Sequence, residues 1–385
     1  MKKILLITQR CPFPPYLNGG VHTVYNILKN IPSNVEIDLF YYYSKDDVAE
    51  FEIKKYVHQI EHKNLYRTPN KRTRLFNFLK GIPDYFSEVE LGKYDIGINY
   101  GKYDTIILDQ IFSLPFANYI PNKIPIISMM HDNNVMMYER KRKNEKGILK
   151  YIYNTKQCIY FENLEKKYFN KIKKVIYVSA LDASIAKKLH SECTAIFDNI
   201  SLGVDLPTEE QISEPISNSI VFSGVMDYGP NEDAAFYFAS EVFPRIKNRV
   251  KNARFVIAGK NPTRLLMGLS SDCIHITGFV EDMYKTITNS EIYVSPLRYG
   301  SGTKNKVLEA MAAGMPVFLT AVSREGIDGL VDGYNCIFID ENNIVDKICN
   351  WLNNKDELDA IAKNGKEYVE KNHSWNDSFD KFLLD

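Results

Sequence analysis

The residues that could do chemistry are concentrated between positions 296 and 316, where the sequence reads PLRYGSGTKNKVLEAMAAGMP. An apolar run precedes this stretch, two glycines lie in its first part, and a glycine and a proline close it. That order predicts a strand, a glycine-containing loop and a helix. Lys306 and Glu309 are three residues apart and therefore share one face of the helix. The apolar stripe that packs inward is predicted to consist of Val307, Leu308 and Met311.

The start of this helix combines an anion site with a polyol site. The first backbone N–H groups of a helix lack partners, and the helix dipole favours negative charge near them. The loop brings Gly302 and Thr303 to this point, where phosphate oxygens fit. Lys306 adds a positive charge, and the carboxylate of Glu309 can accept both protons of a ribose 2′,3′-diol. The stretch is thus predicted to form a nucleotide-sugar pocket.

The alternative is an ordinary helix with an internal ion pair between Lys306 and Glu309. An exposed pair of this spacing contributes only about 0.2–0.5 kcal/mol, and it does not account for a loop with two glycines. We therefore favour the functional interpretation.

At these residues the chain resembles retaining glycosyltransferases of the GT-B fold, in the large family often called family 4 (glycosyl transferases group 1), and the resemblance extends over the whole chain. Members typically read Pro-Leu, a glycine-rich loop and Lys-x-x-Glu-Ala-Met-Ala-x-Gly-x-Pro. The resemblance implies that Glu309 binds the donor ribose and that Lys306 and the amides of 301–303 bind the diphosphate. Many members carry a second glutamate where this chain has Ser301, and a subgroup reads Gly-Ser-Gly-Thr here. This departure affects the hexose contact more than the activity.

The resemblance implies an α/β protein in which two Rossmann-like domains have parallel sheets that face each other across a cleft. A length of 385 residues, with 45% hydrophobic and 25% charged residues, also indicates two ordinary globular domains. We expect four segments: an N-terminal, acceptor-side domain at 1–202, a linker at 203–218, a nucleotide-sugar-binding domain at 219–370, and a C-terminal helix at 371–385 that returns to the first domain.

Apolar runs alternate with helical patterns in both halves, which predicts a parallel sheet covered by helices in each domain. The strands of the first half are predicted at 3–8, 35–43, 105–110, 125–130 and 175–179. Those of the second half are predicted at 219–223, 254–258, 274–277, 292–295 and 316–319. Ligands of such folds bind beyond the carboxyl ends of the strands.

Two loops at predicted strand ends of the first half could contribute to a site. In the first, Gly19 and Gly20 precede a helix predicted from Val21, so that the backbone can approach a ligand closely. A flexible turn explains these residues equally well, but the resemblance implies an approach to the donor phosphate and the acceptor. In the second, His131 follows a strand. A lone histidine there is more often structural, but the resemblance implies a contact with the transferred sugar. Asp132 could orient His131 or cap the next helix.

In the second half, the resemblance places the donor against three further loops. Gly224 corresponds to the family's glycine under the diphosphate, and Asn231 is a candidate N-cap for a helix starting near 232. The arginine that often follows the glycine is absent, so Arg298 or Lys304 is expected to meet the remaining phosphate charge. For Arg298, a surface ion pair is an equally good interpretation. The backbone of the loop that contains Phe279 and Val280 is expected to contact the base.

Charge is distributed unevenly along the chain. Residues 1–180 contain 28 Lys and Arg against 18 Asp and Glu, whereas residues 181–385 contain 20 against 30. The basic excess gathers at 54–80 and 140–174. No nucleic-acid motif accompanies it, and most charge runs are simply solvated. For a glycosyltransferase, we expect the basic face to contact an anionic membrane surface or a lipid-linked saccharide acceptor. No nucleic-acid partner is expected.

The six cysteines show no C-x-x-C spacing and the seven histidines no H-E-x-x-H motif, so neither a metal nor a disulfide framework is expected. The apolar run after Met1 is too short for a signal sequence, and no run is long enough to span a membrane. The expected location is the cytoplasm, with peripheral contact at the inner face of the membrane.

We therefore expect a metal-independent retaining hexosyltransferase that uses a nucleoside-diphosphate sugar and no cofactor, in surface polysaccharide or glycoconjugate assembly. His131, Lys306 and Glu309 are its expected catalytic residues. Two alternatives remain: a nucleotide-sugar epimerase of similar fold, and a non-catalytic sugar-nucleotide-binding scaffold. A nicotinamide dehydrogenase is disfavoured because G-x-G-x-x-G is absent after a strand.

Overall fold

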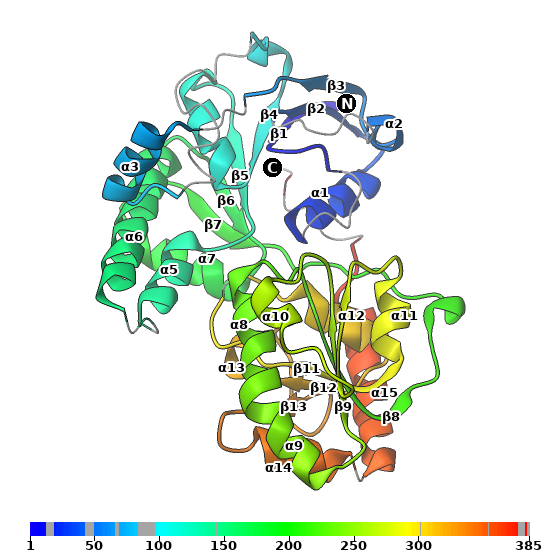
Figure 1. The fold of residues 1–385 in the computed structure, drawn as a ribbon. Coiled ribbons are helices and arrows are strands. Elements are labelled where there is room, and N and C mark those ends of the chain that lie inside the picture. Colours follow the sequence, from blue (N-terminus) through cyan, green and yellow to red (C-terminus); the bar gives the residue numbers. More distant parts are fainter. Residues whose placement is uncertain are drawn as a thin grey trace. The chain divides into compact units, whose positions relative to one another are not determined.

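The chain folds into two compact units in a computed structural model (Figure 1). The structure describes residues 1–12, 19–42, 50–65, 69–83, 97–143, 145, 147–300, 302–352, 354–375 and 382. Unit 1 comprises Met1–Leu202 and Trp375–Asp385, and unit 2 comprises Gly203–Ser374.

Unit 1 is built around a seven-stranded parallel sheet with the order β3-β2-β1-β4-β5-β6-β7. Its strands are β1 (Lys2–Thr8), β2 (Val35–Tyr41), β3 (Gln59–His62), β4 (Thr105–Asp109), β5 (Ile126–Met130), β6 (Lys174–Tyr177) and β7 (Ile196–Asn199). Its helices are α1 (Gly19–Lys29), α2 (Glu50–Ile53), α3 (Lys71–Lys80), α5 (Asn134–Lys143), α6 (Ile148–Phe169) and α7 (Ala180–Leu189), with the 3-10 turns η3 (Tyr100–Lys102) and η4 (Ile111–Asn118).

Unit 2 repeats this plan with a six-stranded parallel sheet of order β10-β9-β8-β11-β12-β13. Its strands are β8 (Ile216–Ser223), β9 (Arg254–Ala258), β10 (Ile274–Gly278), β11 (Ser290–Ser295), β12 (Val317–Leu319) and β13 (Ile337–Phe338). Its helices are α8 (Gly229–Tyr237), α9 (Phe243–Arg249), α10 (Arg264–Met267), α11 (Met283–Thr288), α12 (Asn305–Ala312), α13 (Ala321–Arg324), α14 (Ile344–Trp351) and α15 (Lys355–Asn372), with the 3-10 turn η5 (Glu209–Gln211) and the π-helical turn η6 (Phe238–Val242).

Each sheet is apolar on both faces, as expected for a parallel sheet covered by helices. In β1, Leu5 and Ile7 belong to one buried cluster, whereas the intervening Leu6 belongs to a second. In β8, Phe222 and its neighbour Val221 divide between two clusters in the same way. The expected architecture of two Rossmann-like α/β domains is thus confirmed. The ten predicted strands are present, and the short strands β3, β7 and β13 were not predicted.

The segment expected to be a linker, 203–218, packs on unit 2. Strand β8 begins within it at Ile216, and the Ser213 backbone N–H donates to Oγ1 of Thr288 at 3.0 Å. The hydroxyl of Tyr284 donates to the carbonyl of Asp205. These contacts explain why a polar, proline-containing sequence is ordered: its hydrogen-bonding groups find partners on α11.

The end of the chain returns to unit 1. Helix α15 ends at Asn372, and Trp375 and Phe382 are buried in the cluster of unit 1 that contains β1. The predicted helix at 371–385 lies largely outside the described residues. The chain passes between the units after Leu202 and again after Ser374. Close to both points, the Val204 N–H donates to the carbonyl of His373 at 3.0 Å.

Candidate functional site

The carboxyl ends of β8 and β11 form the switch point of unit 2. These strands are neighbours, but the helices that follow them lie on opposite faces of the sheet. Ala234 of α8 belongs to one buried cluster, and Val307 of α12 belongs to the other. Such a divergence opens a crevice at the strand ends, where ligands of doubly wound sheets bind. The predicted nucleotide-sugar motif lies there.

Helix α12 has the predicted face pattern. Val307, Leu308 and Met311 are fully buried, whereas Lys306 and Glu309 are partly exposed. Gly302 in the preceding loop has a φ of +68°, which glycine adopts without strain. Ser301 lies outside the described residues. The helix start, Gly302, Lys306 and Glu309 are therefore all close to the switch point.

Lys306 is held beneath the end of β8. Its Nζ donates to Oδ1 of Asn231 and lies 4.5 Å from the centre of the Phe222 ring. Burial and the neighbouring charge of Lys304 lower the pKa of Lys306 to about 7, although Glu309 acts in the opposite direction. The protein therefore holds, at a helix start, a lysine that is only partly protonated at neutral pH. A bound anion would raise the pKa of this lysine and so restore its full charge.

Gly224 allows the close packing that positions Asn231. A Cβ atom at Gly224 would lie 2.6 Å from Nδ2 of Asn231, and one at Gly259 would lie 1.8 Å from the carbonyl oxygen of Gly224. Asn231 also donates from Nδ2 to the carbonyl of Val225 at 3.0 Å. Any side chain at Gly224 would thus displace the acceptor of Lys306.

The expectation that Asn231 caps a helix starting near 232 was wrong. Helix α8 begins at Gly229, and Asn231 lies within its first turn. Sequence reasoning also missed the contact with Lys306, since the two residues are 75 positions apart.

The other predicted phosphate ligands make contacts within the protein. Nζ of Lys304 donates to the carbonyl of Gly302 at 2.6 Å. The hydroxyl of Thr303 donates to the carbonyl of Gly326 at 3.2 Å. Arg298 forms a two-pronged ion pair with Asp233 and lies over the ring of Tyr237. Arg298 was expected either to contact a phosphate or to form a surface ion pair, and the structure contains the ion pair.

Phe279 and Val280 follow β10, and the Phe279 side chain is 61% exposed. Val280 lines a cavity of about 780 Å³ that also includes Arg254 and Ser290. These last two are the first residues of β9 and β11. The cavity therefore extends toward the amino ends of the strands and is not the switch-point site.

Three polar residues meet at the carboxyl ends of adjacent strands in unit 1. Nε2 of His131, just after β5, donates to Oδ1 of Asp109 at 2.7 Å. Oγ1 of Thr8, the last residue of β1, donates to Oδ2 of the same carboxylate at 2.7 Å. Asp109 is buried and His131 is 13% exposed. Two donors orient the carboxylate, which in turn fixes the histidine ring, an arrangement suited to holding a polar ligand or a proton.

Thr8 and Asp109 were not among the predicted site residues. Thr8 ends one predicted strand and Asp109 is the last residue but one of another, so the rule that ligands bind at carboxyl ends could have identified them.

Gly19 and Gly20 are the first residues of α1, which begins two residues before the predicted position. Residues 13–18 of the preceding loop lie outside the described residues. For the helix after His131, the cap is Asn133 and not Asp132: its Oδ1 accepts from the Met136 N–H at 2.9 Å. This leaves an orienting role for Asp132 as a prediction.

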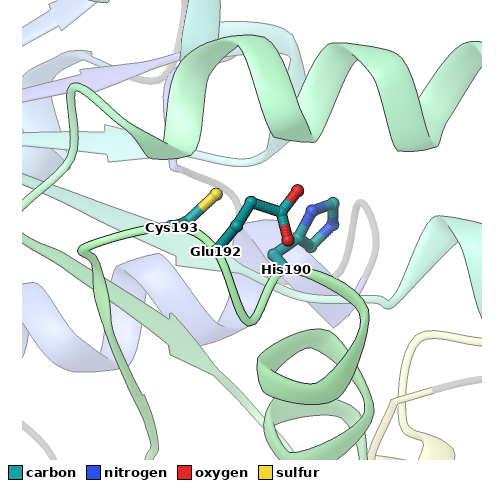
Figure 2. Close-up of side chains that lie close together, drawn as sticks. All are labelled: His190, Glu192 and Cys193. Atoms are coloured by element: carbon teal, nitrogen blue, oxygen red, sulfur yellow. The ribbon is translucent and has the colours of Figure 1, made fainter.

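Two groups in the described part of unit 1 have ligand types that could hold a metal ion. One comprises His190, Glu192 and Cys193 after α7 (Figure 2). His190 is engaged with Glu165 at 2.8 Å and Glu192 with Lys166 at 3.1 Å. Burial and the charge of Glu192 raise the pKa of the Cys193 thiol, which disfavours the thiolate that a metal requires.

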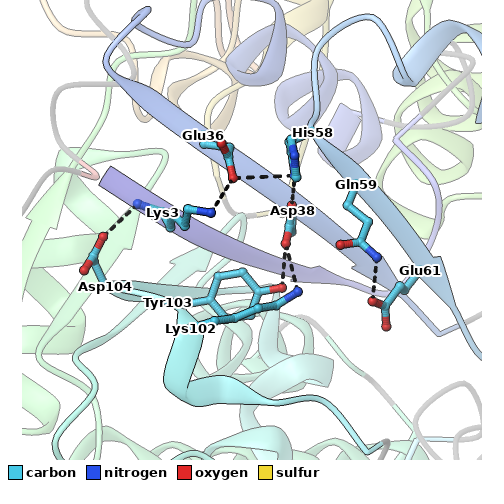
Figure 3. A network of polar contacts seen from close by, with 9 residues as sticks. All are labelled: Lys3, Glu36, Asp38, His58, Gln59, Glu61, Lys102, Tyr103 and Asp104. Atoms are coloured by element: carbon cyan, nitrogen blue, oxygen red, sulfur yellow. Dashed lines mark hydrogen bonds and ion pairs between the residues drawn. The ribbon is translucent and has the colours of Figure 1, made fainter. Parts of the chain in front are cut away.

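The other group comprises Glu36 and Asp38 of β2 and His58, which lies just before β3 (Figure 3). Lys3 contacts Glu36 at 3.1 Å and Lys102 contacts Asp38 at 3.3 Å, so lysines already neutralise both carboxylates. Burial opposes ionisation of Asp38, but hydrogen bonds from His58, Tyr103 and Lys102 outweigh it and lower its pKa. Neither group lies at a carboxyl end where the predicted site residues gather.

Two parallel α/β units of this topology define the GT-B fold. Residues 217–354 match the family model described as glycosyl transferases group 1. This match includes β11, α12 and all but the first residue of β8, and it therefore covers the switch point of unit 2.

Particular proteins resemble the chain over nearly its whole length. An uncharacterized 44.6 kDa protein in the cps region of Klebsiella pneumoniae is 21% identical, with 97% of each chain covered. Among solved structures, TarM has a TM-score of 0.73 and 13% identity, with 100% of this chain and 98% of that chain covered. Sucrose-phosphate synthase from Thermosynechococcus elongatus has a TM-score of 0.68 and 14% identity (99% and 97% covered). HepE of Anabaena in complex with UDP-glucose has a TM-score of 0.67 and 12% identity (100% and 99% covered).

Proposed function

We propose that the chain is a retaining, family 4-like glycosyltransferase that moves a hexosyl unit from a nucleoside-diphosphate sugar to an acceptor hydroxyl. The observation that carries the proposal is the position of Lys306. A lysine with a pKa of about 7 lies at the start of α12, beside a second lysine and at the switch point of the sheet. Like charges held together in this way favour an anionic ligand.

In the proposed complex, unit 2 holds the donor. The amides of Gly302 and Thr303 and the ammonium group of Lys306 bind the diphosphate, with Gly224 beneath it, and Glu309 accepts the ribose hydroxyls. The loop of Phe279 and Val280 contacts the base. Because HepE forms complexes with UDP and UDP-glucose, UDP is the first nucleotide to test.

The role proposed for unit 1 is to contact the transferred hexose and the acceptor. His131, oriented by Asp109, binds a sugar hydroxyl, and Gly19 and Gly20 let the chain approach the phosphate. Arg298 would have to leave Asp233 to reach a donor, so we place it second to Lys306. Ser301, which lies outside the described residues, is proposed as a donor contact through its loop.

We propose a same-face displacement. The bond between the anomeric carbon and the β-phosphate oxygen breaks, the acceptor oxygen bonds to that carbon, and the acceptor proton passes to the departing oxygen. Lys306 and the helix start stabilise the charge that develops on the diphosphate. With these groups in place we expect no requirement for a divalent metal, which would show as unchanged turnover in EDTA.

Saccharides or lipid-linked saccharides are the proposed acceptors, and surface polysaccharide or glycoconjugate assembly in the cytoplasm is the proposed setting. The relative in the cps region supports this proposal.

Calorimetric titration with UDP, GDP, ADP, CDP and dTDP tests the donor site, first in EDTA. One nucleotide should bind, and its sugar conjugates should then be screened for transfer by following nucleotide release with and without saccharide acceptors. Product formation without an acceptor would favour an epimerase. Binding of a sugar nucleotide without turnover of any acceptor would favour a scaffold, and no binding would overturn the proposal.

A further inference from the structure

Helix α3 of unit 1 is inverted relative to an ordinary surface helix. Its one buried residue is Asn77, and Nδ2 of that asparagine has no hydrogen-bond partner among the described residues. The helix instead exposes four large apolar side chains: Leu75 (62% exposed), Phe76, Phe78 and Leu79 (57%). Since a soluble surface helix normally turns its apolar stripe inward, the outer face of α3 has the composition of an inner one.

The beginning of α6 repeats this inversion. Asn154 and Gln157 point inward and are buried, whereas the exposed side chains include Ile148 (70%) and Leu149 (77%), with Tyr151 and Ile152 partly covered. Nδ2 of Asn154 also lacks a partner among the described residues. Two helices with buried amides and exposed aliphatic groups do not reflect chance exposure of single residues.

The two helices lie side by side (Figure 1). The rings of Phe78 and Tyr153 stack with centroids 5.0 Å apart, and Nζ of Lys156 donates to the carbonyl of Leu79 at 3.0 Å. The exposed apolar residues therefore form one surface, here called the α3–α6 surface, made of Leu75, Phe76, Phe78, Leu79, Ile148, Leu149, Tyr151 and Ile152.

Positive charge surrounds these residues without compensation from the same segments. The two segments, 71–80 and 148–161, contain no aspartate or glutamate. Their basic residues are Lys71, Arg72, Arg74, Lys80, Lys150 and Lys156. The Lys80 ammonium group lies 4.5 Å from the centre of the Phe76 ring, so charge and apolar surface are interleaved.

We propose that the α3–α6 surface docks on an anionic lipid bilayer, with its apolar side chains between the headgroups and its lysines and arginines at the phosphates. Interfacial helices have this combination of Leu and Phe with Lys and Arg. A second copy of this chain would bring like charges together. A polynucleotide offers the aliphatic side chains no apolar environment. Within the described residues, no helix has the length and apolar character to cross a bilayer.

Vesicle sedimentation tests the proposal directly, and it does not depend on the proposed catalytic activity. The full chain should bind vesicles of equimolar phosphatidylglycerol and phosphatidylcholine and should bind phosphatidylcholine alone far more weakly. Each basic residue removed should lower affinity about fivefold, as about 1 kcal/mol per residue implies, so Arg72→Glu with Arg74→Glu should lower it at least about 25-fold.

The apolar contribution has a matched control. Leu79→Ser should lower vesicle affinity about tenfold, since an inserted leucine loses most of its contact with water. Ile196→Ser removes an isomeric side chain that is 53% exposed on β7, outside the surface, and should leave affinity unchanged. Both positions are exposed, so melting temperatures should match the wild type and confirm folding.

Three results would overturn the proposal. The first is equal binding to neutral and anionic vesicles, or none to either. The second is an equal effect of Leu79→Ser and Ile196→Ser. The third is a dimer in sedimentation velocity that Leu79→Ser dissociates, because that would assign the surface to self-association.

Discussion

Nζ of Lys306 donates a hydrogen bond to Oδ1 of Asn231, which lies 75 residues earlier in the chain. This contact joins the helix after β11 to the helix after β8 across the switch point of the sheet. It gives the ammonium group a neutral acceptor, so that the positive charge at the start of α12 is held in place without being cancelled. Burial and, after it, the charge of Lys304 lower the pKa of Lys306.

The pH dependence of nucleotide binding should report on Lys306. Its pKa in the free protein is about 7, and a bound diphosphate should raise it. Below pH 7 the lysine is already protonated and affinity should be constant. As pH rises above 7, affinity should fall by up to about tenfold per unit. Calorimetry at pH 8 in buffers of different ionisation enthalpy should detect proton uptake.

Lys306→Arg is the matched control because a guanidinium stays protonated throughout this range. Whatever affinity the variant retains, its proton uptake at pH 8 should disappear. Binding of UDP to the wild type without proton uptake would contradict the assigned role of Lys306.

Glu309→Gln should lower nucleotide affinity about 10- to 100-fold, because hydrogen bonds to a charged acceptor contribute about 1.5–3 kcal/mol. The variant should be compared with the wild type on UDP and on 2′,3′-dideoxy-UDP. If Glu309 accepts the ribose hydroxyls, the two proteins should bind the dideoxy nucleotide equally. A loss of the same size with both nucleotides would instead mean that Glu309 acts through the charge of Lys306.

His131→Ala should lower kcat about 10²- to 10⁴-fold, the range for loss of a positioned polar or proton-transferring group, while the Kd for UDP stays nearly unchanged. Asp109→Asn should give an intermediate loss because the ring keeps a neighbour but loses its charged acceptor. His58→Ala, at the amino ends of the strands, serves as the control and should keep normal turnover. Near-normal turnover in His131→Ala would return that residue to a structural role.

The buried pair of Glu165 and His190 should be important for stability. Burial raises the pKa of Glu165, and His190 is its hydrogen-bond partner at 2.8 Å. His190→Ala leaves the carboxyl group unpartnered and should cost about 3–5 kcal/mol in urea denaturation. Because the pKa of Glu165 is raised in the folded protein, its protonated form contributes to stability at low pH. This contribution is lost as pH rises. The cost of His190→Ala should therefore grow with pH above the usual range of glutamate.

Glu165→Gln in the His190→Ala background is the control for that pair, because it removes the charge and should recover part of the loss. A cost below about 1 kcal/mol for His190→Ala would contradict the assignment of a buried, partner-dependent carboxyl group.

Periodicity predicted a helix-covered parallel sheet in each half and the form of the central helix, whereas the GT-B fold was predicted from the resemblance. The spacing of Val307, Leu308 and Met311 predicted a buried stripe, and these side chains are buried. The strands that were missed are short and at or near sheet edges, and β3 and β7 are polar or exposed, as with Gln59 and Ile196. A strand of this kind has no apolar alternation to detect.

Contacts between distant segments limited the prediction of the candidate site. Nothing in the residues around Asn231 indicates that it meets Lys306, and its position before a helical pattern suggested a cap. Likewise, the choice of Arg298 between a phosphate and an ion pair depends on Asp233, 65 positions away. Local patterns identify which residue types are available, whereas the sheet order determines which of them meet.

The bond between Val204 and His373 has a consequence for how the polypeptide can be cut. The chain passes between its units next to this bond in both directions, and Trp375 and Phe382 remain buried in unit 1. A protease that cleaves within 206–215 would therefore leave the two units attached through the C-terminal segment. The fragments should co-elute under native conditions and separate only in denaturant, so the last residues act as a second tether between the halves of the molecule.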